Sequence, residues 1–380
     1  MKEAEDTVSF IRDYYQRSNF IPLHEPKFLG NEKKYVCNTI DSTFVSSVGA
    51  YVDKFEDMMA SITAVKKAVA VVNGTAGIQV ALRLAGVKEG DEVITQALTF
   101  VATANAIKYN GAEPVFLDVD YETMGLSHIA LKHFLEEYGE IRDDGCFNKI
   151  SGKKISACLP MHTFGFPVKI DKIIPICEEW NIPVVEDAAE SLGSSYKGKH
   201  TGAFGKLGVF SFNGNKIVTS GGGGAIVTND ELVGKKAKYL TTTAKISHPY
   251  EYIHDELGYN FRMPNLNAAL VCGQLESLSE FVDKKRKLAN KYDQFFDGLG
   301  IKFRKEPEHS RSNYWLMCVE LQNKRDREEF LKYTNQNGVM TRPIWKLMYK
   351  LDMYKDCFRD NQKNAEFLED RIVNIPSSIR

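Results

Sequence analysis

The feature that most constrains the fold is an alternation, between residues 64 and 230, of short apolar runs with amphipathic stretches of helical period. Most of the apolar runs are rich in valine or isoleucine and are apolar on both faces, as central strands of a mostly parallel sheet are. The runs expected to form strands are Ala68–Val72, Glu92–Thr95, Pro114–Leu117, Ile155–Leu159, Pro183–Glu186, Gly208–Phe212 and Gly224–Val227. The helices expected between them include Ala76–Leu84, Val101–Tyr109 and Asp171–Trp180. This order predicts an α/β fold with a mostly parallel central sheet and helices on both faces.

The segments on either side of this block have a different character. Upstream, Glu32–Asp41 and Tyr51–Ile62 are expected to be helices. Downstream, Pro264–Leu299 reads as helical, and a break is expected near residues 277–279 because so long a single helix is unusual in a globular domain. We therefore expect three parts: an N-terminal helical segment with substrate loops (1–63), a large cofactor-binding domain (64–263), and a linking helix with a smaller C-terminal α/β domain (264–380).

The composition argues against several classes of function. The net charge is −1, so bulk electrostatics does not favour a nucleic acid or an anionic membrane as partner. No apolar run approaches the ~18 residues that a membrane helix requires, and the first residues lack the apolar core of a signal peptide. The seven cysteines are scattered without a CxxC pair, which favours reduced thiols in a cytoplasmic protein over a disulfide framework or a metal site.

Two polar residues follow separate buried strands. Asp187 comes directly after Val184-Val185-Glu186, and Lys216 follows the apolar run that ends in Ser211. One cofactor, pyridoxal 5'-phosphate, needs these two groups together, because a carboxylate keeps its pyridine nitrogen protonated and a lysine forms its Schiff base. Parallel α/β sheets also bind their ligands at the carboxyl ends of the strands. Taken singly, Asp187 is equally well explained as a helix cap or loop residue, and Lys216 as a surface lysine.

A possible phosphate site lies upstream at Asn73-Gly74-Thr75-Ala76, between a predicted strand and a predicted helix. Free N–H groups at a helix start, with a hydroxyl and a flexible glycine, suit a phosphate dianion. Ser211 can supply a further donor. The competing interpretation is an ordinary capped helix, and the stretch is neither a Walker loop nor a GxGxxG fingerprint.

Three more residues are candidates for the same pocket. Glu190 can reach the phenolic oxygen of the cofactor, although a carboxylate beside that oxygen has to share a proton with it. Phe100 can stack on the cofactor ring, although an aromatic residue at a helix start is more often part of the core. His162 follows a strand end and either lines the pocket or is a structural histidine.

Taken together, five motifs in this order resemble the DegT family of fold-type I pyridoxal phosphate-dependent nucleotide-sugar aminotransferases. The motifs are Asn73-Gly74-Thr75-Ala76, Thr99-Phe100-Val101-Ala102-Thr103, Glu186-Asp187-Ala188-Ala189, Ser211-Phe212-Asn213-Gly214-Asn215-Lys216 and Gly258-Tyr259-Asn260-Phe261-Arg262-Met263. The resemblance covers nearly the whole chain.

The resemblance implies a role for each candidate. Lys216 would form the Schiff base, and Asp187 would pair with the pyridine nitrogen. Phosphate contacts and ring stacking would come from Gly74, Thr75, Ala76, Ser211 and Phe100. Asn260 would reach the cofactor phosphate of a neighbouring subunit, which implies a homodimer with shared active sites. The residue at the position of Glu190 varies among relatives, many of which carry histidine or glutamine there.

Lysine at position 216 favours full transamination, because a related branch of sugar dehydratases has histidine there. The implied reaction moves an amino group from glutamate to the C4 keto group of a nucleotide-linked 4-keto-6-deoxy sugar. The segments 21–26 and 43–49 resemble the branch that acts on 4-keto-6-deoxy-N-acetylhexosamine nucleotides in legionaminic- or bacillosamine-type pathways. A C3 aminotransferase, a dehydratase on the same scaffold and a non-catalytic binding protein are the alternatives. The sequence does not decide between UDP, GDP and dTDP.

Overall fold

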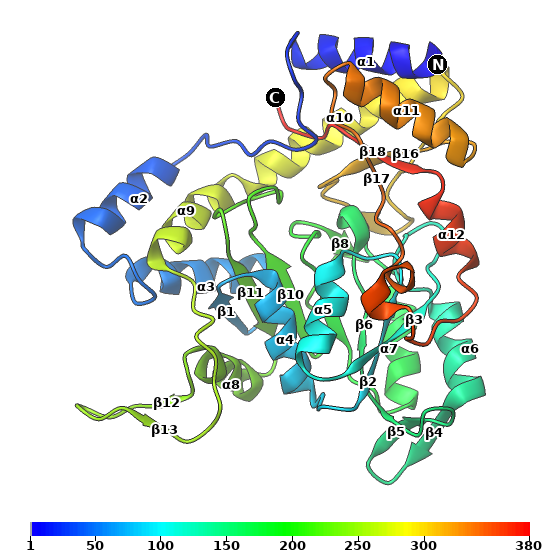
Figure 1. Cartoon of the computed structure of the whole chain (residues 1–380). Coiled ribbons are helices and arrows are strands. Elements are labelled where there is room, and N and C mark those ends of the chain that lie inside the picture. The colour runs from blue at the N-terminus through cyan, green and yellow to red at the C-terminus, as the bar shows by residue number, and fades with distance from the viewer. Residues whose placement is uncertain (1) are drawn as a thin grey trace.

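The computed structural model describes residues 2–380 (Figure 1). The helices are α1 (Lys2–Tyr15), α2 (Glu32–Asp41), α3 (Ala50–Thr63), α4 (Gly74–Ala85), α5 (Val101–Tyr109), α6 (His128–Tyr138), α7 (Ile170–Glu179), α8 (Glu231–Thr241), α9 (Asn265–Glu276), α10 (Leu278–Gly298), α11 (Lys324–Gln336) and α12 (Lys363–Glu369). The strands are β1 (Lys67–Val71), β2 (Glu92–Gln96), β3 (Glu113–Leu117), β4 (Gly139–Arg142), β5 (Gly145–Asn148), β6 (Lys154–Leu159), β7 (Val185–Asp187), β8 (Ser195–Tyr196), β9 (Lys199–His200), β10 (Leu207–Ser211), β11 (Gly224–Thr228), β12 (Lys245–Ile246), β13 (Ile253–His254), β14 (Lys302–Phe303), β15 (Ser310–Arg311), β16 (Met317–Glu320), β17 (Arg342–Pro343) and β18 (Ile372–Ile375). Short 3₁₀ turns lie at Thr163–Gly165, Met348–Lys350 and Asp352–Tyr354.

The central sheet has the strand order β3-β2-β6-β7-β10-β11-β1. Strands β2, β3 and β6 pair in parallel, as do β7 and β10, whereas β11 runs antiparallel to both of its neighbours. Strands β6 and β7 are joined by two isolated bridges, Cys158 to Val184 and Met161 to Asp187. The carboxyl ends of the parallel strands therefore meet at one edge of the sheet.

Both faces of this sheet are covered by helices, because alternate residues of the strands point to opposite sides. On one face, Val209 packs in a cluster with residues of α4, α5 and α8. On the other, the neighbouring Phe210 packs with residues of α3 and α9. Helices α6 and α7 cover the sheet near β2, where Ile94 packs with Leu131 of α6 and Ile173 of α7. The fold is α/β, as the sequence predicts.

The C-terminal part is built around a second, antiparallel sheet of order β14-β16-β18-β17. Helices α9 and α10 lead to it, and Figure 1 shows α1, α10 and α11 gathered above it, near both termini. Helix α1 was not predicted from the sequence, and it is held there by contacts such as the stacking of Phe10 on Phe295, with ring centroids 4.1 Å apart. The break near residue 277 is confirmed, since α9 ends at Glu276 and α10 begins at Leu278.

The seven predicted strands of residues 64–230 all form, with ends that differ from the predicted ones by up to two residues. In the part of the chain that the structure describes, no helix combines the length and apolar character needed to cross a membrane.

Candidate functional site

A cavity of about 620 Å³ lies where the carboxyl ends of the parallel strands face the C-terminal part of the chain. Among the residues proposed from the sequence, those that line it are Gly74, Thr75, Phe100, Asp187, Glu190, Ser211 and Lys216. These residues come from four separate segments of the chain. Three of the segments follow β1, β7 and β10, which run in the same direction and therefore end at the same edge of the sheet.

One end of the cavity is formed by the start of α4 and the end of β10. The side chain of Asn73 caps α4 by accepting a hydrogen bond from the Ala76 N–H at 2.8 Å. A Cβ on Gly74 would lie 3.0 Å from the Cβ of Ser211, and a Cβ on Gly224 would lie 2.9 Å from the Gly74 nitrogen. Only glycine allows backbone to approach so closely here. The helix N-terminus and the Ser211 hydroxyl thus face one small space, which suits a phosphate.

Asp187 ends β7 and is almost fully buried, with 2% of its surface exposed. One carboxylate oxygen accepts a hydrogen bond from the Thr103 hydroxyl at 2.7 Å, and the other accepts one from the Ala189 N–H at 3.1 Å. Burial raises the pKa of Asp187, and these two donors together with the charge of Lys216 act in the opposite direction. The carboxylate is therefore held in place beside a cationic partner.

Lys216 lies in the turn after β10, and its side chain points between two groups. Its Nζ is 3.3 Å from Glu190 Oε1 and 3.8 Å from the centre of the Trp315 ring. Glu190 Oε2 accepts a hydrogen bond from the Phe164 N–H at 2.9 Å. Burial raises the pKa of Glu190 to about 7, although the neighbouring Lys216 lowers it. The Glu190 carboxyl group can therefore take up or release a proton near neutral pH, directly beside Lys216.

Phe100 lines the cavity at the start of α5 and is 48% exposed, so it is not a core residue. Its ring lies 6.3 Å from that of Trp345, which lines the same cavity. An exposed aromatic ring at this position is available to stack on a bound ring.

Three proposed residues lie outside this cavity. The Ala76 N–H is already bonded to Asn73, which leaves Gly74 and Thr75 as the lining residues of the helix start. His162 is fully buried between Glu186, at 3.0 Å from its Nε2, and the Val168 N–H, which donates to its Nδ1 at 3.2 Å. Of the two interpretations of His162, the contacts favour a structural histidine. Asn260 is exposed and accepts a hydrogen bond from Arg262, at 2.9 Å.

The structure adds residues that the sequence interpretation missed. Thr103 holds Asp187, and Trp315 contacts Lys216. The cavity is also lined by Leu23, Met161, Asn213, Asn215, Arg342, Trp345, Lys346 and Asn374. Thr103 belongs to a motif already noted, so only its role was missed. The residues after 300 carry no local signal, because nothing in the sequence shows which loop of the C-terminal part reaches the central sheet.

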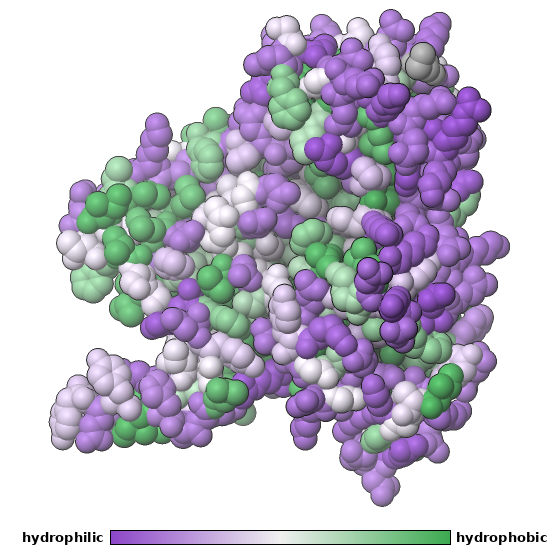
Figure 2. All heavy atoms as spheres, viewed as in Figure 1, coloured by the Kyte–Doolittle hydropathy of each residue, from purple (hydrophilic) through white to green (hydrophobic). Residues whose placement is uncertain are grey.

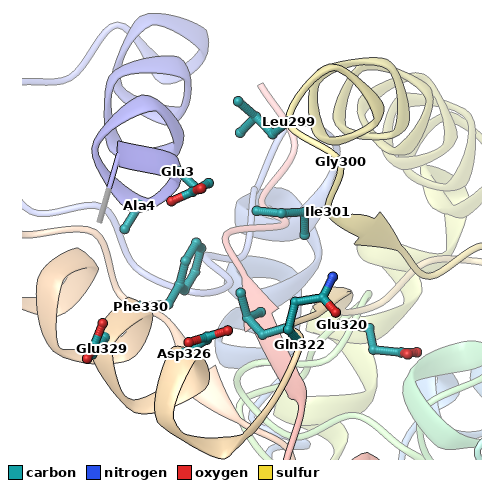
Figure 3. A pocket seen from close by; sticks show the side chains of 11 residues that line it. Glu3, Ala4, Leu299, Gly300, Ile301, Glu320, Gln322, Asp326, Glu329 and Phe330 are labelled. Atoms are coloured by element: carbon teal, nitrogen blue, oxygen red, sulfur yellow. The ribbon is translucent and has the colours of Figure 1, made fainter.

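A second cavity, of about 340 Å³, lies between α1, α11 and the end of α10 (Figure 3). Its lining combines apolar side chains such as Phe330 with the carboxylates Glu320, Asp326 and Glu329. Each of these carboxylates has a partner elsewhere, for example Arg304 at 3.0 Å from Glu320. Among residues 2–380, no lysine, cysteine or histidine lines this cavity, so they bring it no amine like that of Lys216.

Comparison with known proteins agrees with this geometry. The model of the DegT/DnrJ/EryC1/StrS aminotransferase family matches residues 27–380. EpsN of Bacillus subtilis (strain 168), whose name assigns it provisionally as a pyridoxal phosphate-dependent aminotransferase, is 38% identical over 362 residues, covering 94% of this chain and 90% of EpsN. GDP-perosamine synthase of Escherichia coli O157:H7 is 36% identical over 358 residues, covering 94% of this chain and 93% of the synthase. The crystal structure of the aminotransferase TlmJ from Streptoalloteichus hindustanus has a TM-score of 0.84 and 26% identity, covering 94% of this chain and 93% of TlmJ.

Proposed function

The chain belongs to the DegT/DnrJ/EryC1/StrS aminotransferase family, and from that premise we propose that it transfers an amino group from glutamate to the C4 keto group of a nucleotide-linked 4-keto-6-deoxy sugar. The family and its relatives are pyridoxal phosphate-dependent sugar aminotransferases, so the chain is an enzyme of this kind and its cofactor is pyridoxal 5'-phosphate. Family membership implies a nucleotide sugar and an amino donor as substrates. The donor, the carbon atom and the residue roles given below are our proposals.

The observation that carries the proposal is the meeting of Asp187, Lys216 and the Gly74–Ser211 space in one cavity. The backbone at Gly74 and Gly224 approaches too closely for a side chain. The helix start and the Ser211 hydroxyl line the same cavity and suit a phosphate, so these residues fit the cofactor. Gly74, Thr75 and Ser211 would hold its phosphate, Asp187 its ring nitrogen, and Phe100 one face of its ring. When bound, the cofactor supplies an electron sink that lets an amino group pass between two carbon skeletons.

The chain's own contribution is to hold and move protons. Asp187 would keep a proton on the ring nitrogen, and its burial strengthens that contact because water does not compete for the carboxylate. Lys216 lines the cavity, and its Nζ would take a proton from the donor carbon and return it to the sugar carbon. Glu190 is close enough to Lys216 to exchange a proton with it. A contact between Glu190 and the phenolic oxygen of the cofactor stays a prediction.

The preference for C4 is supported by the GDP-perosamine synthase relative. Perosamine is a 4-amino-4,6-dideoxy sugar, and its formation by amino transfer places the new amine at C4 of a 6-deoxy skeleton. The segments 21–26 and 43–49 point instead to an N-acetylated hexosamine, but they agree on the 4-keto and 6-deoxy features. We therefore propose C4 amination and test both sugar types.

We also propose that the active enzyme is a homodimer. Large apolar side chains are exposed around α2, the loop before α3 and the β12–β13 hairpin, namely Phe28, Leu29, Ile40, Phe44, Val48, Tyr250, Tyr252 and Leu257. Figure 2 shows such apolar residues gathered around α2 and α3, on a projecting part of the molecule. Soluble monomers seldom expose large contiguous apolar patches. Asn260, which lies outside its own cavity, would then reach the phosphate in the neighbouring subunit.

The decisive assay incubates the enzyme with glutamate and a panel of GDP-, UDP- and dTDP-linked 4-keto-6-deoxy sugars, with and without an N-acetyl group. We expect 2-oxoglutarate and one amino sugar, whose NMR spectrum places the nitrogen at C4. An amine at C3 would contradict the proposed C4 amination and identify a C3 aminotransferase. Loss of a sugar hydroxyl without glutamate consumption would identify a dehydratase.

A further inference from the structure

The two side chains beside Lys216 are chemically suited to an ammonium group. Glu190 supplies a carboxylate oxygen 3.3 Å from Nζ, and Trp315 places its ring centre 3.8 Å from the same atom. A carboxylate and an indole face both attract a cation, and both do so more strongly when they are shielded from water. Glu190 and Trp315 are 3% and 4% exposed.

Trp315 is fixed in this position by bonds at both ends. Its indole Nε1 donates to the Asn215 carbonyl oxygen at 2.7 Å, directly before Lys216 in the chain. Its main-chain carbonyl accepts hydrogen bonds from Lys285 Nζ at 3.1 Å and from the Ser377 hydroxyl at 2.8 Å. The ring therefore has little freedom to move away from the lysine.

Glu190 is fixed as well, and it shares a support with Trp315. The Phe164 N–H that bonds Glu190 Oε2 belongs to a residue with φ of 57°, a left-handed conformation that a phenylalanine rarely adopts. Asn313 joins the two partners, because its Nδ2 donates to the Glu190 carbonyl at 2.9 Å and its Oδ1 accepts from the Trp315 N–H at 2.8 Å. Asn313 is fully buried. One side chain thus sets the spacing of both groups around Lys216.

We propose that Glu190 and Trp315 form a holding site for the Lys216 ammonium, used whenever the lysine is not bonded to the cofactor, and that Glu190 Oε1 receives the proton when the ammonium becomes an amine. The step balances as one proton moving from Nζ to Oε1, with the ion pair becoming a neutral amine and a neutral carboxyl group. Glu190 and Trp315 are positioning residues in this scheme. The inference rests on the proposed function, since it assumes that Lys216 alternates between a bonded and a free form.

Other charged groups near the pair do not replace this role. Burial is the main reason that the pKa of Glu190 is raised to about 7, and the charge of Asp187 acts in the same direction. Lys285 and Lys216 both act on His24, where burial first and then these charges lower the pKa of the imidazole. His24 is therefore neutral and adds no further positive charge near Lys216. Glu190 supplies the carboxylate oxygen that contacts Nζ directly.

The test measures the chemical reactivity of Lys216 in the full-length enzyme loaded with pyridoxamine 5'-phosphate, in which the lysine is free. Trace acetylation at pH 8, read by peptide mass spectrometry, reports the fraction of Nζ present as amine. The exposed Lys206 serves as an internal reference. We expect acetylation of Lys216 to rise about tenfold in Glu190→Gln, because a lost carboxylate neighbour costs an ammonium about one pKa unit. We expect a rise of about threefold in Trp315→Leu, from loss of the cation–π contact.

Two controls separate this effect from easier access to the lysine. Glu190→Gln keeps the size of the side chain, and Glu190→Asp keeps the charge and should restore part of the protection. Trp345→Leu opens the same cavity without removing a lysine contact and should leave the Lys216 rate within twofold of wild type. Should Glu190→Gln fail to retain the cofactor, the Trp315 and Trp345 variants decide the question.

Unchanged acetylation in both Glu190→Gln and Trp315→Leu, or an equal rise in Trp345→Leu, would overturn the holding site. This failure is distinct from failure of the proposed function. If no nucleotide-linked keto-sugar is aminated but the Lys216 rates change as expected, the holding site stands and the substrate assignment falls.

Discussion

Glu186 and Glu190 are two buried carboxylates only four residues apart, yet their surroundings differ sharply. Glu186 is fully buried and accepts four hydrogen bonds, from His162 Nε2 at 3.0 Å and from the N–H groups of Gly202, Phe204 and Gly205 at 2.8, 2.7 and 2.7 Å. Glu190 has two donors, the Phe164 N–H and Lys216. Glu186 receives all of its hydrogen bonds from structural groups of the fold, whereas one of the two donors to Glu190 is the lysine proposed to be reactive.

The difference shows in their proton affinities. Burial alone would raise the pKa of Glu186, but the bonds from His162 and the backbone outweigh it and the pKa ends below its usual value. Burial raises the pKa of Glu190 to about 7, and its fewer donors do not reverse the effect. Hydrogen-bond count thus separates a carboxylate that supports the sheet from one that can take part in chemistry.

The largest effect is expected at Lys216, the lysine that contacts Glu190. Lys216→Ala should lower amino transfer by more than about 1000-fold, because it removes the amine that would form the Schiff base and move the proton. The absorbance band of the lysine-bound cofactor should disappear with it. The exposed Lys206→Ala should leave both unchanged. Turnover retained at a tenth of wild type would contradict the assignment.

The next largest effect is expected at the satisfied carboxylate. Glu186→Ala should lower the free energy of unfolding by about 3–5 kcal/mol, because it leaves buried His162 and three N–H groups without their acceptor. Chemical denaturation measures this loss. Glu320→Ala, which removes a carboxylate paired with Arg304 at 3.0 Å, is the control and should cost less because Arg304 keeps its hydrogen bonds to the Tyr121 and Glu122 carbonyl oxygens. A loss below 1 kcal/mol for Glu186→Ala would contradict the structural role assigned to Glu186.

Glu190→Gln should change stability in a pH-dependent way. The folded pKa of about 7 lies above the ordinary value of 4.5, so the folded protein holds this proton more tightly than the unfolded chain. That contribution is complete below pH 4.5 and is lost as the pH rises through 7. Between pH 5 and pH 8 the variant should therefore gain about 1–3 kcal/mol relative to wild type. Denaturation at both pH values with saturating cofactor measures it, and a constant difference would contradict it.

The smallest effect is expected at the support of Asp187. Thr103→Val removes the 2.7 Å hydrogen bond to its carboxylate without changing the size of the side chain. The pKa of Asp187, already raised by burial, should rise further and weaken its hold on the cofactor. We expect kcat to fall about tenfold, with a shift of the cofactor absorbance. Thr99→Val removes the hydroxyl that lies 2.8 Å from that of Thr103 but keeps the Thr103 donor to Asp187, and it should change kcat less than threefold.

Much of the fold could be predicted from the sequence because its central strands are buried on both faces. Runs such as Val69–Val72 leave little choice of structure, and the break at Ser277 follows from length alone. Helix α1 was missed because its pattern was taken only as evidence against a signal peptide. Its contact with Phe295, nearly 300 residues away, is a tertiary interaction that no local pattern records.

The site could be predicted only in part, for a related reason. Asp187, Lys216 and Gly74 each follow a strand, so the edge where they meet was predictable from strand order. Trp315 comes from the C-terminal part, and its contact with Lys216 depends on how that part docks. The sequence also left His162 undecided, and only the contacts to both of its ring nitrogens identify it as structural.

The most direct test of the account treats the purified enzyme with borohydride after loading with pyridoxal 5'-phosphate and maps the modified peptide by mass spectrometry. We expect the cofactor mass on Lys216, in the peptide that contains Asn215 and Ile217. We also expect Asp187→Asn to keep this attachment while losing most turnover. Attachment to a different lysine, with Lys216 unmodified, would contradict it.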